Sequence, residues 1–152
     1  MPIHARLEKQ RLNAAVELEE LARIAAGDGR IVSFVGLARD TSKSGENVEK
    51  LVIDHHPQLT QVSLEEIASD AAARFEVSHV RVVHRCGDIP PSEAIVFAGA
   101  SAVHRRAAFE AADYLMDRLK TEAVFWKREE GASGSTWIEP TDADHADRDR
   151  WE

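Results

Sequence analysis

Helical and extended sequence patterns alternate along this chain, and their order constrains the fold more than any other feature. Apolar residues recur at helical intervals in three segments, which are residues 13–26, 59–75 and 106–119. Runs of β-branched and apolar residues predict strands at residues 30–37, 49–55, 80–86 and 94–100. A final hairpin is predicted from residues 125–130 and 136–139, around the loop 131–135. The order αββαββαββ indicates an α+β fold.

The length of the chain indicates one domain followed by a tail. A chain of 152 residues suits a single domain that buries about two thirds of its surface. We assign residues 1–139 to this domain, with an exposed loop at residues 40–47. Residues 140–152 are acidic and almost free of apolar side chains before Trp151, which predicts a flexible tail. The alternative is that Trp151 docks into the groove of a partner.

The charge balance and the N-terminus argue against two kinds of partner. The net charge of −8 is opposite in sign to that needed for nonspecific nucleic-acid binding. No apolar run approaches the ~20 residues that span a membrane. The N-terminal residues are charged and lack the apolar centre of a signal peptide. We therefore expect a cytoplasmic protein with no nucleic-acid or membrane partner.

Cationic side chains gather around the third predicted helix. His104, Arg105 and Arg106 lie at its start, Lys120 lies at its end, and Lys127 lies on the strand that follows. Like charges normally spread over a surface to limit repulsion. Their clustering in a chain of net charge −8 indicates an anionic ligand such as a phosphate or carboxylate.

Lys120 and Lys127 are the candidates for chemistry in this cluster. Taken singly, Lys120 is explained by the negative end of a helix dipole, and Lys127 by the solvent-facing side of an edge hairpin. A short turn between the helix and the strand would instead let both amines converge on one pocket. A lysine that is partly desolvated beside another cation has a lowered pKa and can act as a base or nucleophile.

Two further places are suited to an anion. His104 and Arg105 open a helix, where backbone N–H groups and an arginine bind anions. The alternative there is a capping histidine and a solvated arginine. Arg39 ends a strand beside the loop 40–47, and its alternative role is to pack along its own aliphatic stem.

We expect neither a metal site nor a bound cofactor. His55 and His56 are adjacent on a predicted strand and point to opposite faces, and no glycine motif for nucleotide phosphates occurs. Cys86 is the only cysteine, so no intrachain disulfide is possible. It is either a persulfide carrier or a small hydrophobe, and its place at a strand end favours the second.

Five blocks, in order, resemble the family of the large, catalytic subunit of molybdopterin synthase. They are GRIVSFVGLARD at residues 29–40, His55-His56-Pro57, His84-Arg85-Cys86-Gly87, His104-Arg105, and Lys120 followed by the FWKREE segment. The resemblance covers residues 27–137. It implies an α/β-hammerhead-like fold with an additional mixed or antiparallel β subdomain, and a sulfurtransferase that works as a homodimer.

The resemblance also implies two substrates. Sulfur comes from the C-terminal Gly-Gly thiocarboxylate of a small ubiquitin-like partner subunit. The acceptor is cyclic pyranopterin monophosphate, and the product is the dithiolene molybdopterin. The alternative is a noncatalytic module that binds a ubiquitin-like protein tail, which needs a groove but not both lysines.

The resemblance further assigns roles to individual residues. Lys120 and Lys127 are implied to be catalytic, with Lys120 the essential one. The implied substrate-binding residues are Arg39, Leu37, Ala38, His104, Arg105, Arg128 and Glu129, of which His104 and Arg105 bind phosphate from the neighbouring subunit. The chain departs from the family pattern at Leu37-Ala38, at His56 where tyrosine is expected, and at Val124 where proline is usual.

Overall fold

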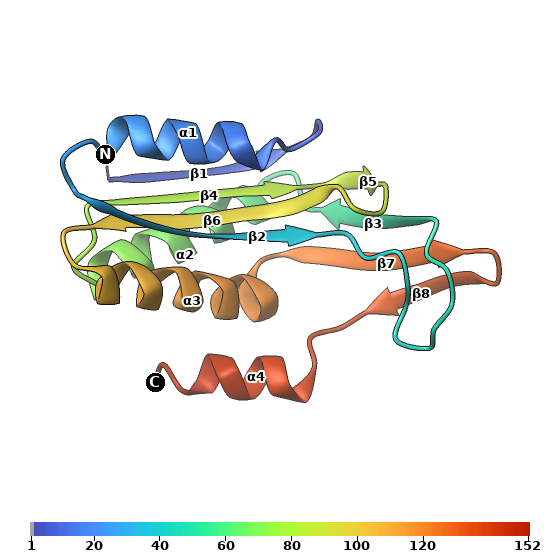
Figure 1. Cartoon of the computed structure of the whole chain (residues 1–152). Helices are drawn as coiled ribbons and strands as arrows, with labels where there is room; N and C mark the ends of the chain where they lie inside the picture. Colours follow the sequence, from blue (N-terminus) through green and yellow to red (C-terminus); the bar gives the residue numbers. More distant parts are fainter. Residues whose placement is uncertain (1) are drawn as a thin grey trace.

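The computed structural model describes residues 2–152, which form two four-stranded sheets and four helices (Figure 1). The helices are α1 (Ala14–Ile24), α2 (Leu59–Arg74), α3 (Arg105–Glu122) and α4 (Asp142–Asp149). The strands are β1 (Ile3–Glu8), β2 (Arg30–Leu37), β3 (Lys50–His55), β4 (His79–Arg85), β5 (Gly87–Ile89), β6 (Ala94–Ala102), β7 (Phe125–Gly131) and β8 (Gly134–Ile138). No helix within residues 2–152 is both long and apolar enough to cross a membrane.

The first sheet has the strand order β1-β4-β6-β2 and lies between helices (Figure 1). Strand β1 runs parallel to β4, and the other neighbours are antiparallel. Helix α1 covers one face, where Leu21 packs with Val83 and Phe97. Helices α2 and α3 cover the other face, where Val80 and Val82 join the largest core cluster. Because side chains alternate along β4, this one strand contributes residues to the core on both faces of the sheet.

The second sheet has the order β5-β3-β7-β8 and is antiparallel throughout. It lies beyond the end of α3, on the right of Figure 1. A smaller core cluster that includes Leu51, Ile53 and Ile89 supports it. The two sheets confirm the predicted α+β class with an additional β subdomain.

Strand β1 was not predicted, because charged residues interrupt its apolar pattern. The structure pairs it with β4 and satisfies Arg6 through Glu17 of α1, at 2.8 Å. Paired in this way, a charged side chain is tolerated on a covered face of a sheet. The short strand β5 was also not predicted.

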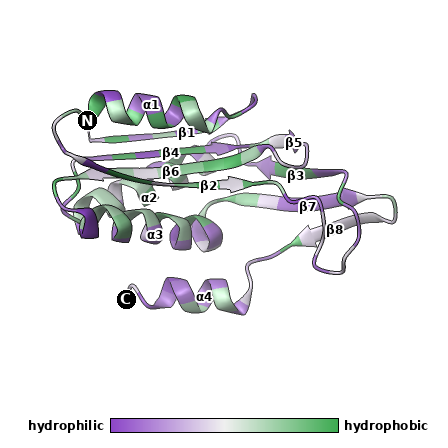
Figure 2. Cartoon of the chain, in the orientation of Figure 1, coloured by the Kyte–Doolittle hydropathy of each residue, from purple (hydrophilic) through white to green (hydrophobic). Residues whose placement is uncertain are grey.

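The C-terminal segment is helical, in contrast to the predicted flexible tail. Helix α4 begins with a capping box, in which Thr141 and Asp144 each accept a hydrogen bond from the other's backbone N–H. Figure 2 shows that the helix is mainly hydrophilic, so it lacks the apolar stripe that predicts a docked helix. Ion pairs attach it instead: Arg150 lies 2.6 Å from Asp113 and 2.8 Å from Asp117, both on α3.

Trp151 packs the end of the chain against the largest core cluster. Its ring meets Phe75 and Tyr114 edge-on, with centroid distances of 5.6 and 5.4 Å. Its indole Nε1 donates a hydrogen bond of 2.7 Å to Asp117. Trp151 therefore packs against α3 and the C-terminal end of α2 of its own chain.

Candidate functional site

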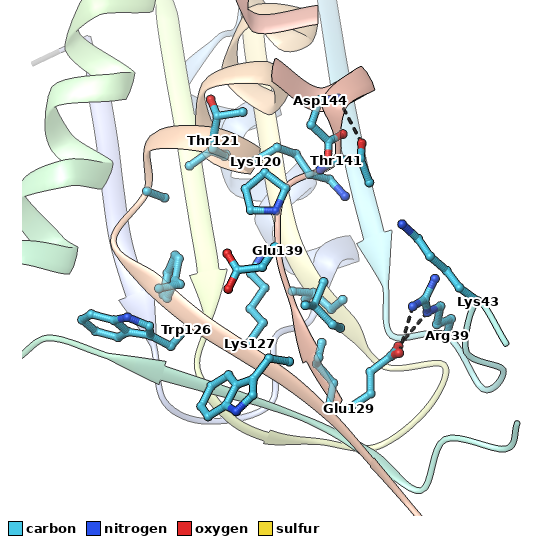
Figure 3. A pocket seen from close by; sticks show the side chains of 18 of the residues that line it. Arg39, Lys43, Lys120, Thr121, Trp126, Lys127, Glu129, Glu139, Thr141 and Asp144 are labelled. Atoms are coloured by element: carbon cyan, nitrogen blue, oxygen red, sulfur yellow. Dashed lines mark hydrogen bonds and ion pairs between the residues drawn. The ribbon is translucent and has the colours of Figure 1, made fainter. Parts of the chain in front are cut away.

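A cavity of about 580 Å³ lies where the end of α3, the hairpin β7–β8 and the start of α4 meet (Figure 3). Charged side chains of both signs project into it from several elements. They are Arg39, Lys43, Lys120, Lys127, Glu129, Glu139 and Asp144. Four of these seven are cationic, so the cavity is suited to an anionic ligand.

Lys120 and Lys127 line this cavity together (Figure 3). Lys120 is in the last turn of α3, which ends at Glu122, and β7 begins at Phe125. This short connection turns the chain so that a helix residue and a strand residue face the same space. Both lysines also line a second cavity of about 310 Å³, on the side of β2.

Helix α2 holds the connection between the two lysines in place. Thr60 donates a hydrogen bond of 2.6 Å from Oγ1 to the carbonyl oxygen of Val124. The backbone N–H of Val124 donates to Ser63 Oγ at 3.2 Å. The fold therefore accommodates valine at residue 124, where the family usually has proline, because valine supplies an N–H that proline lacks.

Strand alternation explains why Lys127 points inward with Phe125 and Glu129, which also line the cavity. Burial, which removes water from its ammonium group, and the nearby charge of Lys120 together lower the pKa of Lys127 to about 8. Asp144 acts in the opposite direction. Lys127 therefore has a large fraction of neutral amine close to pH 8, which an exposed lysine does not.

Arg39 is fixed beside the cavity by Glu129. Its Nε and Nη2 donate to the two carboxylate oxygens of Glu129, at 2.6 and 2.8 Å. Glu129 is buried, so the pair is a shielded, bidentate contact rather than a mobile surface one. Figure 3 shows this pair at the cavity wall. It brings together two residues that the resemblance assigned to substrate binding.

Leu37 and Ala38 take different positions. Leu37 lines both cavities. Ala38 is buried in the second core cluster, and its backbone groups are hydrogen bonded to Ser92 and Glu93. The structure therefore places Leu37, but not Ala38, on a cavity wall.

Arg128 lies outside the cavity, because it alternates with Lys127 along β7. Its Nη1 donates to Asp54 at 2.9 Å, and its Nε donates to Glu130 at 3.1 Å. The guanidinium also lies over the ring of Trp137, 5.6 Å from the centroid. In this chain Arg128 ties together the strands of the second sheet.

His104 and Arg105 lie at the opposite end of α3 from Lys120. Both side chains are exposed, and His104 is the residue that precedes the helix. The helical rise over residues 105–120 is roughly 22 Å. Within one chain, the structure does not bring this pair together with the lysines.

The strand β8 was predicted as part of a hairpin, but its role as a cavity wall together with α4 was not. This wall contributes Trp137, Glu139, Asp144 and His145. Burial acts to raise the pKa of Asp144, but hydrogen bonds with Thr141 and the charge of Lys120 lower it overall. For the α4 part of this wall, the sequence signal is the possible capping box at Thr141, which lies in a segment predicted to be flexible.

Cys86 is buried at the end of β4, with 3% of its surface exposed. Burial raises the pKa of its thiol and so disfavours the reactive thiolate. Residues 2–152 contain no group of three or more His, Cys, Asp or Glu side chains placed to hold a metal ion. The lysine cavity is therefore the chemically distinctive feature of the described chain.

Comparisons with known proteins show which proteins this chain resembles. A family model described as "MoaE protein" matches residues 7–122. The chain is 47% identical to a molybdopterin synthase catalytic subunit from Caulobacter vibrioides, over 82% of this chain and 81% of that one. It is 42% identical to the protein of the same name from Vibrio cholerae, over 96% of both chains. The solved structure of a molybdopterin biosynthesis MoaE protein from Burkholderia ambifaria has a TM-score of 0.80 at 34% identity and covers 98% of this chain and 96% of that one.

Proposed function

Because the chain belongs to the MoaE protein family, we propose that the cavity at Lys120 and Lys127 is its sulfur-transfer site. The chain shares the function of its relatives, which are molybdopterin synthase catalytic subunits, and is a sulfurtransferase of molybdenum cofactor biosynthesis. The main support for this position of the sulfur-transfer site is that two lysines, one with a lowered pKa, line a single cavity. A noncatalytic binding module needs a groove but has no use for such a lysine.

The substrates in this proposal are two anions. One is the C-terminal Gly-Gly thiocarboxylate of a small ubiquitin-like partner subunit, and the other is cyclic pyranopterin monophosphate. A solved complex of subunits 1 and 2 of molybdopterin-converting factor from Helicobacter pylori has the same fold, with a TM-score of 0.73 at 18% identity over 91% of this chain and 90% of that one. The cationic cavity supports this pair of substrates, because two anions approach each other only where cations offset their repulsion. Both substrates are water-soluble, and a cytoplasmic location is part of the proposal.

Each transfer moves one sulfur atom. The thiocarboxylate sulfur forms a bond to a carbon of the pterin side chain and displaces an oxygen substituent, which leaves that carbon and takes up a proton. Water then attacks the acyl carbon, breaks the acyl carbon–sulfur bond, and leaves a carboxylate on the partner and a thiolate on the pterin. Lys120 assists the attack by sulfur, and Lys127 handles protons and charge near the thiocarboxylate. A pKa of about 8 suits Lys127 to this role, because a group that exchanges protons works best near the ambient pH.

Arg39 holds the pterin in this proposal, and its pairing with Glu129 sets the direction of its remaining donors. His104 and Arg105 bind the phosphate of a substrate in the neighbouring subunit of a homodimer. The distance between this pair and Lys120 along α3 supports a shared site, since one chain cannot bring them to the same ligand.

The proposal is tested by Lys120→Ala, assayed with a thiocarboxylated partner and the cyclic pterin. Formation of the dithiolene should be nearly abolished while the fold is kept, because a lysine at a helix end contributes little to stability. Lys50→Ala is the matched control, since Lys50 lies on neighbouring β3 and pairs with Asp88 on the surface. Retention of more than about a tenth of the turnover by Lys120→Ala, a barrier change below ~1.4 kcal/mol, would remove Lys120 from the catalytic role.

A further inference from the structure

His84 occupies a position where the fold calls for an apolar side chain. It follows Val80 and Val82 in the row of β4 side chains that faces α2 and α3, and only 3% of its surface is exposed. Burying an imidazole costs free energy unless its polar atoms are used. The functional assignments above give His84 no role, although it belongs to one of the sequence blocks.

The structure fixes both the orientation and the tautomer of this ring. Nδ1 lies 2.9 Å from the carbonyl oxygen of Arg85, and a carbonyl only accepts hydrogen bonds, so Nδ1 carries the proton. Nε2 is then the nitrogen with a free lone pair. One face of the ring stacks on Phe125, with a centroid distance of 4.1 Å and an interplanar angle of 28°. These two contacts prevent the ring from turning.

The ring that carries this free nitrogen shares a cavity with the two lysines. His84 lines the cavity of about 310 Å³ together with Lys120 and Lys127, and no carboxylate lines this cavity. The Nζ of Lys127 lies 5.9 Å from the centroid of Phe125, the ring on which His84 stacks. Burial and the charges of Lys127 and Lys120 lower the pKa of His84 to about 3, so the ring stays neutral at physiological pH.

We propose that His84 is a positioning residue for Lys127: its Nε2 is the acceptor toward which the Lys127 amine turns inside the cavity that both residues line. No hydrogen bond joins the two side chains in the described conformation, so the contact forms when the lysine side chain moves toward the ring. The choice of acceptor is significant. A carboxylate at this place would strongly favour the ammonium form of the lysine, whereas a neutral imidazole directs the amine without adding a charge. The second cavity therefore contains a neutral acceptor, His84, next to the two lysines. The carboxylate of Asp144 lines only the larger cavity. The consequence for turnover rests on the proposed function, but the proposed hydrogen bond does not.

Two substitutions separate the acceptor from the shape of the ring. His84→Phe keeps an aromatic ring against Phe125 and removes the acceptor, whereas His84→Gln offers an amide oxygen near the position of Nε2. Acetic anhydride labelling of Lys127, followed by mass spectrometry across a pH series, reports the midpoint at which its amine becomes reactive. Lys50 serves as the internal reference because it pairs with Asp88 on the surface.

An accepted hydrogen bond favours the ammonium form, so its loss in His84→Phe should lower the labelling midpoint of Lys127 by about one pH unit. His84→Gln should restore most of this shift, and neither variant should move the midpoint of Lys50. An unchanged Lys127 midpoint in folded His84→Phe would overturn the inference. In the steady-state assay, His84→Phe should lower kcat with little change in KM for the pterin, and a change in KM alone would also count against positioning.

Nitrogen-15 NMR of the unmodified protein provides a test that does not depend on the variants folding. The expected spectrum shows His84 neutral, with its proton on Nδ1 and with Nε2 shifted by an accepted hydrogen bond. A proton on Nε2 would make that atom a donor and would refute the inference. Labelling and NMR use no substrate, so they decide the role of His84 even if the proposed reaction fails its own test.

Discussion

Replacing Trp151 by alanine tests whether the C-terminal segment is part of the folded domain. The substitution removes edge-on contacts with Phe75 and Tyr114 and the hydrogen bond to Asp117. Two aromatic pairs contribute roughly 1–3 kcal/mol, and a hydrogen bond to a carboxylate contributes about 1.5–3 kcal/mol. These terms overlap and the ring is only partly buried, so we expect the free energy of unfolding to fall by about 3 kcal/mol. In a domain of this size, that loss lowers the midpoint of thermal unfolding by about 6–12 °C.

Far-ultraviolet circular dichroism is the suitable assay, because it does not depend on the fluorescence of the deleted indole. Trp137→Ala is the matched control, since Trp137 is 58% exposed and its ring lies under the guanidinium of Arg128. Its loss should cost less than about 1 kcal/mol. Trp151→Phe should fall between the two, because it keeps a ring but loses the hydrogen bond to Asp117. If Trp151→Ala and Trp137→Ala unfold at the same temperature, Trp151 does not anchor the segment and the reasoning is refuted.

Three further predictions concern the reaction. Because the neutral amine of Lys127 is the active form, kcat should rise as the pH passes through about 8 and level off above it, and a profile that stays flat there would contradict this role. Lys120→Ala and Arg105→Ala, each inactive alone, should recover part of the activity when their subunits are mixed. Mixtures that stay inactive after confirmed exchange would show that each site belongs to one chain. Cys86→Ser should still turn over with a pre-thiocarboxylated partner as the only sulfur source, with a stability loss of about 1–3 kcal/mol from the buried hydroxyl. A folded but inactive Cys86→Ser protein would indicate a persulfide relay.

Local periodicity predicted the parts of the fold that depend on local sequence. The strand predicted at residues 30–37 is β2, and the helix predicted at residues 59–75 differs from α2 by one residue. The convergence of Lys120 and Lys127 was also foreseen, because a short connection between a helix and a strand leaves few geometries. Because side chains alternate along β7, Lys127 points into the cavity and Arg128 points away from it. Arg128 had been assigned to the site only from the resemblance.

Elements held by distant partners were not predictable in this way. Helix α4 depends on ion pairs from Arg150 to residues 33 and 37 positions earlier, and Trp151 depends on packing against two other helices. Strand β1 is defined by parallel pairing with β4, which no nearby residue signals. The composition shows that both segments are charged, but it does not show which oppositely charged residue pairs with each side chain.

The central position of β7 in its sheet has a consequence for engineering the enzyme. Lys127 is paired on one side with Ile53 of β3 and on the other with Ile138 of β8, so its backbone is clamped by two ladders of hydrogen bonds. The opposite wall, from α4, has no such ladder among the described residues and is attached mainly through the side chains of Arg150 and Trp151. A library that aims to change which substrate is accepted should therefore vary the α4 wall and keep β7 constant. The strand β7 would then keep the lysine in position, while substitutions in α4 change the shape of the cavity wall.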